Sequence, residues 1–263
     1  MVWQELRMQR KSFIGFTVGM LVVFSMFLFF FDSFKEDAAL LDLLLKNFPD
    51  EFKAAFGFSD VNLSEFIGYM SFLFSYLVLI GAVFGMKIGV GALSEEYRAK
   101  TSDFLLSKPI QRKAIVTAKL EAALIMLLAQ TLIVYGYTLI FSTLVISENI
   151  DYKLFSLIVG SLLGVQLFFV GIGFLVSVTL PRIKNVMPIT LGLVFIFFII
   201  ELINQSIMDK KLAYLTPFAY FKGSEIIKTG GYSMVFVSLV ALVFCLSMVL
   251  TYCIYDKKDI KAV

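Results

Sequence analysis

The chain contains no histidine and only two cysteines. Without histidine it lacks the residue most often used as a metal ligand and as a general base at neutral pH. Cys245 and Cys253 lie in one apolar run, about 12 Å apart along a helix axis, which is too far for a disulfide. We interpret them as packing residues, with a metal or redox role as the minor alternative. These absences remove most of the usual metal-site and acid–base chemistry.

Charged residues are scarce as well, at 16% of the 263 residues, whereas 59% are hydrophobic and the mean hydropathy is +0.89. An ordinary soluble domain is about 45–50% apolar. A net charge of +3 is unremarkable for a membrane protein and gives no argument for a nucleic-acid partner. The composition predicts an integral membrane protein, with the whole chain, 1–263, as a single transmembrane domain.

Long apolar runs recur along the chain, each near the length of about 20 residues that a helix needs to cross a bilayer. They predict an all-α membrane protein with six spans: 13–31, 66–91, 118–146, 154–180, 187–207 and 233–255. The first run follows basic residues, as in a signal peptide. Its apolar part is too long and no small-residue cleavage site follows, so we expect it to remain as a span.

The distribution of Lys and Arg predicts the orientation of these spans. With the N-terminus inside, 15 of the 23 basic residues fall in inner segments and 8 in outer segments. These inner residues are counted over the arm 1–12, the stretch from Lys87 to Lys119 around the segment 92–117, the turn 181–186 and the tail 256–263. Because basic residues gather on the cytoplasmic side, both termini are predicted to be cytoplasmic.

Three segments outside the spans are predicted to lie at the membrane surface. In the outer loop 32–65, apolar residues at helical spacing flank Pro49, which predicts two short amphipathic helices. The outer loop 208–232 mixes aromatic with charged residues and is also predicted to be interfacial. The arm from Trp3 to Lys11 is expected on the inner surface, with its tryptophan and basic residues at the headgroups.

The inner segment contains the stretch "EEYRAKTSDFLLSKPIQRKAI", residues 95–115. It predicts a short helix with Ser94 as the N-cap, acidic residues in the first turn and Pro109 at its end. One face of this helix would carry the apolar residues Leu93, Tyr97, Phe104 and Leu105. On these grounds alone, an interfacial hairpin that anchors basic side chains at the headgroups is an equal alternative.

This stretch resembles the cytoplasmic signature of permease subunits in type-2 ATP-binding-cassette (ABC) exporters. The similar residues are Glu96, Thr101, Leu105, Leu106, Ser107, Pro109, Arg112 and Lys119. Lys100 stands where that family usually has glycine before the threonine. This difference concerns the geometry of the local turn more than the family assignment. The six spans, the N-terminal arm and the "LTPF" of residues 215–218 are also similar to the family, so that the resemblance covers essentially the whole chain.

The resemblance implies a non-catalytic subunit that pairs with a second, identical or related, permease around two ABC ATPase subunits in a bacterial plasma membrane. The segment between spans two and three would be a coupling helix that docks on the ATPase. Its contact residues would be Glu95, Glu96, Tyr97, Thr101, Phe104, Leu105 and Pro109. No G-x-x-x-x-G-K-[ST] loop occurs in the chain, so ATP and Mg²⁺ would bind the partner. An amphipathic cargo, lipid-like or a peptide antibiotic, is a guess from composition.

Glu201, with Asn204 and Gln205 at i+3 and i+4, forms a polar face inside the fifth span. It is predicted toward the outer side, near enough to the surface for hydration. An inter-helix clamp or a snorkelling group is the leading interpretation, followed by a substrate or dimer-interface patch and then a proton site. Glu121, just inside the third span beside Lys119, is interpreted as an interfacial charge that pairs with a basic neighbour, in preference to a transport site.

Three other functions remain as alternatives. An ion-coupled secondary transporter would depend on Glu201, and a non-transporting membrane scaffold would need no docking helix. A CAAX-type intramembrane protease is suggested by "EEYRAK", but this motif ends in Lys100 instead of arginine and the histidines of that family are absent.

Three glycine pairs with four-residue spacing are candidates for close helix contacts. They are Gly15 with Gly19, Gly81 with Gly85, and Gly160 with Gly164.

Overall fold

The computed structural model describes residues 1–36, 49, 62–63, 65–98, 111–146, 150–180, 183–207 and 211–257. Six long helices have the length and composition to cross a membrane, which confirms the predicted number of spans. They are α1 (Val2–Phe29), α5 (Phe66–Arg98), α7 (Arg112–Val145), α8 (Tyr152–Thr179), α9 (Val186–Ile207) and α12 (Met234–Lys257). No strand occurs in these described ranges, so the all-α prediction is also confirmed.

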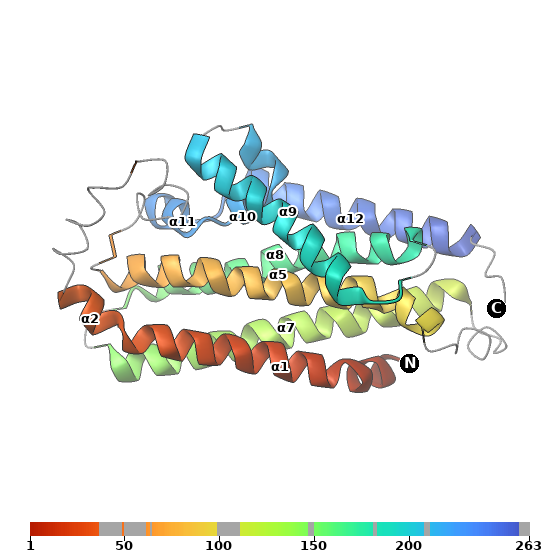
Figure 1. Cartoon of the computed structure of the whole chain (residues 1–263), viewed down its shortest axis with the longest axis horizontal. Coiled ribbons are helices and arrows are strands. Elements are labelled where there is room, and N and C mark those ends of the chain that lie inside the picture. The colour runs from red at the N-terminus through yellow and green to blue at the C-terminus, as the bar shows by residue number, and fades with distance from the viewer. Residues whose placement is uncertain are drawn as a thin grey trace.

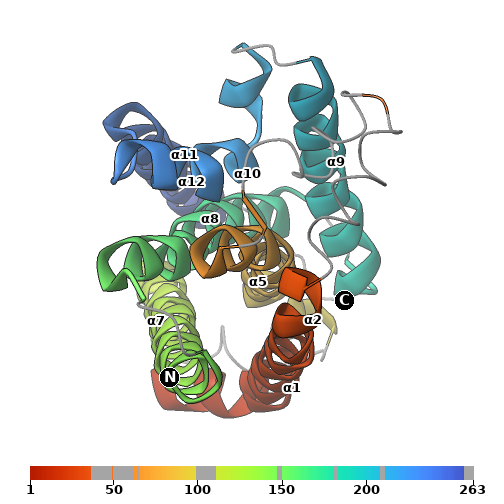
Figure 2. The same ribbon diagram turned by 90° about the vertical axis from the view of Figure 1, so that its left-hand side faces the viewer.

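Helices α5 and α8 form the centre of the bundle. About two thirds of the apolar window of each, 67%, is buried, against 22–28% for the other four long helices. The view along the bundle shows α1 and α7 on one side of this central pair and α9 and α12 on the other (Figure 2). The outer helices can leave most of their apolar surface exposed because that surface would face lipid.

Glycine allows the two central helices to approach closely. A Cβ atom added at Gly89 would lie 2.6 Å from the Val170 carbonyl oxygen and 2.8 Å from the Cα of Gly173, and one at Gly85 would lie 3.0 Å from the Gln166 carbonyl oxygen. These neighbours are backbone atoms that cannot move aside, so only glycine fits this contact. By contrast, nothing lies within 4 Å of a Cβ added at Gly15 or at Gly19.

The end of α5 differs from the prediction. The helix runs without interruption from Phe66 to Arg98, so the span and the first part of the predicted coupling helix are one element. Ser94 lies inside this helix, and its hydroxyl donates to the Val90 carbonyl oxygen at 2.6 Å. The N-cap prediction for Ser94 is therefore wrong. An N-cap needs free backbone N–H groups, and here the preceding turns already supply the carbonyl partners.

The N-terminal arm likewise continues a span, because α1 is helical from Val2 onward. Its first turns cross toward the beginning of α7 (Figure 2). Trp3 is 79% exposed, as expected of a side chain that anchors in lipid headgroups.

Shorter helices lie between the spans. The described part of the first outer loop contains α2 (Phe31–Glu36); the amphipathic helices predicted around Pro49 lie outside the described residues. Between α9 and α12, the chain forms η1 (Leu212–Leu215), α10 (Pro217–Tyr220) and α11 (Gly223–Thr229).

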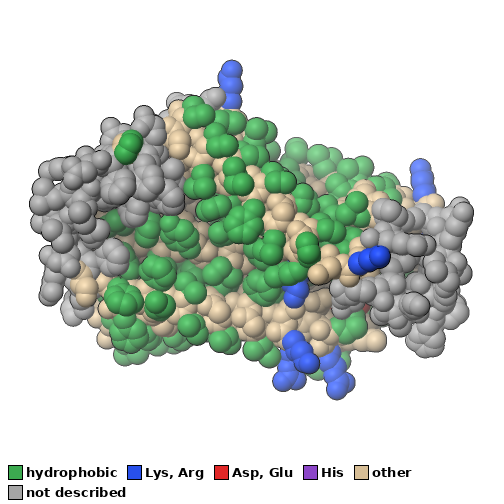
Figure 3. Space-filling model, viewed as in Figure 1, with side chains coloured by type: hydrophobic (Ala, Val, Ile, Leu, Met, Phe, Trp, Pro, Cys, Tyr) green, Lys and Arg blue, Asp and Glu red, His purple; other side chains and the backbone are tan. Residues whose placement is uncertain are grey.

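The N-terminus and the C-terminal end of α12 lie at the same end of the bundle as the C-terminal end of α5 and the N-terminal end of α7 (Figure 1). We call this the terminal end, and the other end, which carries η1, α10 and α11, the distal end. On the face shown in Figure 3, hydrophobic side chains cover the middle, and most of the visible Lys and Arg side chains gather toward the terminal end. The helices that flank the predicted coupling segment, α5 and α7, therefore meet the start of α1 and the end of α12 at one end of the bundle.

Candidate functional site

The predicted coupling residues lie at the edge of the described structure. Glu95, Glu96 and Tyr97 belong to the last helical turns of α5, but their side chains are outside the described part, as are residues 99–110, which include Thr101, Phe104, Leu105 and Pro109. Leu93, placed by the sequence on the same apolar face, is only 1% exposed and packs in the interior. The contact surface of this segment thus stays a prediction.

A buried ion pair lies beside the last part of α5, near Ile88 and Ala92. The Lys119 ammonium donates to Glu5 Oε1 at 2.7 Å, and their side chains are 2% and 16% exposed. The cavity beside the pair measures only about 10 Å³, at the lower limit for one water molecule. The pair joins the N-terminal arm to α7 without intervening water, whereas Glu121, predicted to pair with a basic neighbour, is exposed.

Polar contacts also join the arm to α5. The Lys87 ammonium donates to the hydroxyl of Ser12 and lies 5.5 Å from the centre of the Phe16 ring, close enough for a cation–π contact. Lys87 and Ser12 are separated by 75 positions in the sequence. Together with Lys119, Lys87 fixes the arm against two helices that border the predicted coupling segment.

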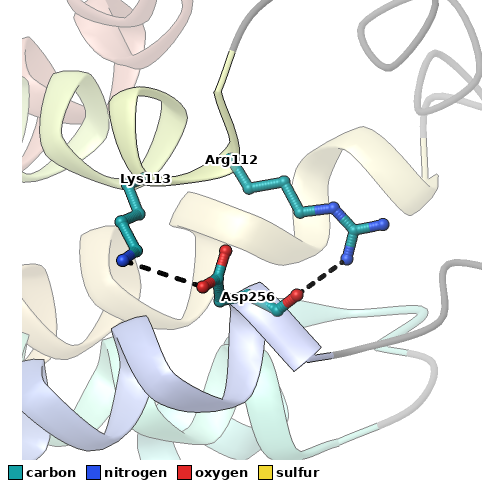
Figure 4. Close-up of polar contacts among 3 residues, drawn as sticks. All are labelled: Arg112, Lys113 and Asp256. Carbon is teal, nitrogen blue, oxygen red and sulfur yellow. Dashed lines mark hydrogen bonds and ion pairs between the residues drawn. The ribbon is translucent and has the colours of Figure 1, made fainter.

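The start of α7 is also tied to the end of α12 (Figure 4). Arg112 donates to the Asp256 carbonyl oxygen at 3.2 Å, and the Lys113 ammonium lies 3.7 Å from Asp256 Oδ2. One turn further, the hydroxyls of Thr117 and Tyr252 lie 2.8 Å apart. The ion pair is half exposed or more on both sides, so it contributes less than the buried Lys119–Glu5 pair.

Midway along the bundle, a chain of amide and hydroxyl groups joins three helices. Gln166 of α8 donates to Gln130 of α7 at 2.6 Å, and Gln130 donates to Thr17 of α1 at 3.2 Å. Both glutamines are fully buried. Because such groups are costly to bury without partners, this chain fixes how the three helices pack.

At the distal end, the polar face predicted on α9 exists as a hydrogen-bonded cluster. The Gln205 amide donates to Glu201 Oε1 at 2.8 Å, and Asn204 Nδ2 lies 3.5 Å from Oε2, at the limit of a hydrogen bond. Contrary to the expectation of a carboxylate near the surface, Glu201 is only 3% exposed. It faces the interior of its own chain.

Glu201 lines a cavity of about 60 Å³ between α5, α8, α9 and the segment that joins α10 to α11. Lys222 lines the same cavity, and its positive charge attracts the carboxylate. The remaining polar lining comes from Ser71 and Ser75 of α5 and Ser161 of α8. The cavity thus collects charged and hydroxyl groups from four parts of the chain.

The segment after α9 is held firmly over this cavity. Thr216 is fully buried and donates to the Phe197 carbonyl oxygen at 2.9 Å, and Tyr220 stacks on Phe236 with ring centres 4.9 Å apart. Tyr232 donates to the Leu157 carbonyl oxygen at 2.5 Å, and burial raises its pKa to about 12. Gly160 makes room for this hydroxyl, since an added Cβ would lie 2.7 Å from it. These contacts fix the backbone on both sides of Lys222.

The sequence did not predict the roles of two charged residues, Glu5 and Lys222. Glu5 pairs with a residue 114 positions away, and no local pattern encodes such a distance. Lys222 gives a weak signal, since it stands alone after the apolar "FAYF". Glu201, Asn204 and Gln205 could be grouped because residues at i+3 and i+4 share a helix face.

Comparison with known families matches the chain almost from end to end. A family model described as ABC-2 family transporter protein covers residues 1–260. A search of curated proteins finds no match. The matched range includes the six long helices, the terminal-end contacts and the distal cavity.

Proposed function

Because the chain belongs to the ABC-2 family of transporter proteins, as a multi-pass permease subunit, we propose that it couples ATP hydrolysis on separate ABC ATPase subunits to export of a substrate. The proposed complex contains two permeases, identical or related, in a bacterial plasma membrane, with both termini of this chain in the cytoplasm. ATP and Mg²⁺ bind the ATPase subunits.

The observation that supports this proposal best is the construction of the terminal end. The helices that border residues 99–110 are joined to α1 through the buried Lys119–Glu5 pair and to α12 through Asp256. A force applied by an ATPase to this segment would therefore reach α1, α5, α7 and α12 together. A permease needs such a connection, because closure of the ATPase dimer must bias the spans between two states.

The test is purification of the tagged chain from its native host in lipid nanodiscs, with mass spectrometry of the co-purifying proteins and an ATPase assay. We expect an ABC ATPase to co-purify. Glu96→Arg and Leu105→Trp should release it without unfolding the spans, because both residues belong to the proposed contact. Glu201→Gln, at the distal end, is the matched control and should retain it.

Two results would contradict the proposal. One is a chain that purifies alone, without ATP-dependent behaviour. The other is loss of the ATPase in the Glu201→Gln variant combined with normal binding in the two contact variants. The second result would favour an ion-coupled transporter that depends on Glu201, because an ionisable residue inside a span is a functional candidate in itself.

A further inference from the structure

We propose that the distal cavity binds the protonated primary amine of an amphipathic cargo, with Glu201 as its counter-ion and Lys222 as an internal competitor. The inference rests on the proposed export function and names a chemical class for the cargo. It is argued from the polar groups that face the cavity, from its aromatic wall and from its opening.

The polar groups around the cavity are mainly hydrogen-bond acceptors. Ser75 and Ser161 donate their hydroxyl protons to carbonyl oxygens of their own helices, at 3.1 and 2.6 Å, so their lone pairs stay available. The Gln205 Oε1 atom is buried and has no hydrogen-bond partner in the described structure. With the Glu201 carboxylate, this makes an acceptor-rich site that fits a group with several N–H donors.

A buried carbonyl oxygen without a hydrogen-bond donor is destabilising, so its presence needs a reason. Gln205 uses its amide N–H to hold Glu201, and its oxygen is thereby left without a donor. A ligand ammonium beside Glu201 would supply this donor. Water molecules would satisfy the same atom, and the experiment below separates these two occupants.

The rest of the wall is aromatic and suits a cation with an apolar body. Phe74, Phe198, Phe218 and Phe221 line the cavity, and the faces of aromatic rings attract positive charge. The volume of about 60 Å³ is enough for an ammonium group and its first carbon atoms. Ser75, on the lining, is exposed, so the cavity opens at α5 and the apolar remainder of the ligand can lie outside it.

Lys222 provides a primary ammonium of the protein itself in the same cavity. Its charge already attracts Glu201, so a ligand amine would compete with it for the carboxylate. Lys222 is only partly buried, and its long side chain can move its charge toward water when that happens. This arrangement predicts opposite effects for the two residues: removal of Glu201 weakens binding, and removal of Lys222 strengthens it.

The experiment uses the full chain in nanodiscs and two fluorescent probes. One is dansylcadaverine, which has a free primary amine, and the other is the same molecule acetylated on that amine. Binding is followed by fluorescence anisotropy near pH 7. We expect the amine probe to bind the wild-type chain at least about tenfold more tightly than the acetylated probe, because only the free amine can form charge-assisted hydrogen bonds with Glu201.

The variants then identify the site. Glu201→Gln should weaken binding of the amine probe about tenfold or more, and Lys222→Met should tighten it severalfold. Lys228→Met is the matched control, because this lysine lies on α11 with a 56% exposed side chain and pairs with Glu225 instead. It should change affinity less than about twofold.

Equal binding of the two probes, or wild-type affinity in the Glu201→Gln variant, would overturn the inference. Water molecules would then be the occupants of the cavity. Weaker binding in the Lys222→Met variant would also overturn the inference. Thermal unfolding of each variant shows whether the chain is intact. If Glu201→Gln unfolds, Ser161→Leu, which fills the cavity from α8, serves in its place and should also weaken binding. Binding needs no ATPase, so a chain that binds the amine but recruits no ATPase refutes the export function alone.

Discussion

Two largely buried carboxylates, Glu5 and Glu201, lie at opposite ends of the molecule and have different surroundings. At the terminal end, Lys119 and Glu5 touch at 2.7 Å beside a cavity of about 10 Å³. At the distal end, Glu201 accepts from an amide of its own helix, shares a cavity of about 60 Å³ with Lys222, and leaves a neighbouring acceptor unsatisfied. The Lys119–Glu5 pair is closed and holds helices together, whereas the Glu201 carboxylate has room to accept another partner.

A glutamate-to-glutamine substitution at each end, Glu5→Gln and Glu201→Gln, tests whether the two carboxylates contribute differently to stability. Glu5→Gln removes the carboxylate charge that the buried Lys119 ammonium contacts at 2.7 Å. Breaking such a pair costs about 3–5 kcal/mol. We expect a large fall in the thermal unfolding temperature of the chain in nanodiscs, and loss of ATPase stimulation by the chain.

The charge swap Glu5→Lys with Lys119→Glu should recover much of the lost stability, because it restores an ion pair in the same place. Glu121→Gln on the exposed face of α7 is the control and should be nearly neutral. If Glu5→Gln were as stable as the wild type, the pair would not hold the arm in place.

Glu201→Gln should cost less, about 1 kcal/mol. The new amide keeps an oxygen that accepts from Gln205, and Lys222 can turn toward water. The measurement is again thermal unfolding, compared directly with Glu5→Gln. A loss as large as that of Glu5→Gln would show that the Glu201 cluster is structural, and the contrast between the two ends would disappear.

Tyr232→Phe tests the segment that closes the distal end and should cost about 1 kcal/mol for the lost hydrogen bond to Leu157. It should also change the pH dependence. Burial raises the folded-state pKa of Tyr232 to about 12, above the ordinary value near 10. The wild-type chain should therefore lose stability as the pH rises from about 10 to 12, because only the unfolded state ionises readily there.

The phenylalanine variant should lack this part of the alkaline loss. Parallel unfolding curves for the two proteins between pH 9 and 12 would contradict the assignment.

Asp256→Asn should have the smallest effect. Its ion pair with Lys113 spans 3.7 Å, with both side chains at least half exposed, and such pairs contribute about 0–1 kcal/mol. The contact between Arg112 and the backbone carbonyl remains in the variant. The small loss should vanish in high salt, whereas the loss in Glu5→Gln should persist, because buried charges are screened less.

Much of the fold follows from the sequence because each span is encoded locally. Apolar runs of sufficient length predicted six helices, and residues at i+3 and i+4 predicted the contacts of Glu201 with Asn204 and Gln205. The contact of α5 with α8 through Gly85 was among the predicted small-residue contacts, whereas Gly15 and Gly19 follow the same pattern and face open space. Spacing alone does not reveal which side of a helix meets a neighbour.

The rest depends on contacts between distant parts of the chain. The Lys119–Glu5 pair joins the two ends of the first half of the protein, and no periodicity specifies it. Ser94 was misassigned because serine favours N-caps, yet it is tolerated inside a helix when its hydroxyl bonds to the preceding turn. Lys222 acquires its role only when α5, α8 and α9 surround it.

The unbroken helix α5 has a mechanical consequence. It carries Ser71 and Ser75 of the cavity near one end and the first residues of the predicted ATPase contact at the other, and it touches α8 most closely at Gly85 and Gly89. At 1.5 Å per residue, the cavity serines lie about 20 Å along α5 from the glycine contact with α8. The C-terminal end of α5 lies about 15 Å from the glycine contact in the other direction. A rigid rod that tilts on such a pivot moves its ends in opposite directions, so a pull at one membrane face opens or narrows the pocket near the other.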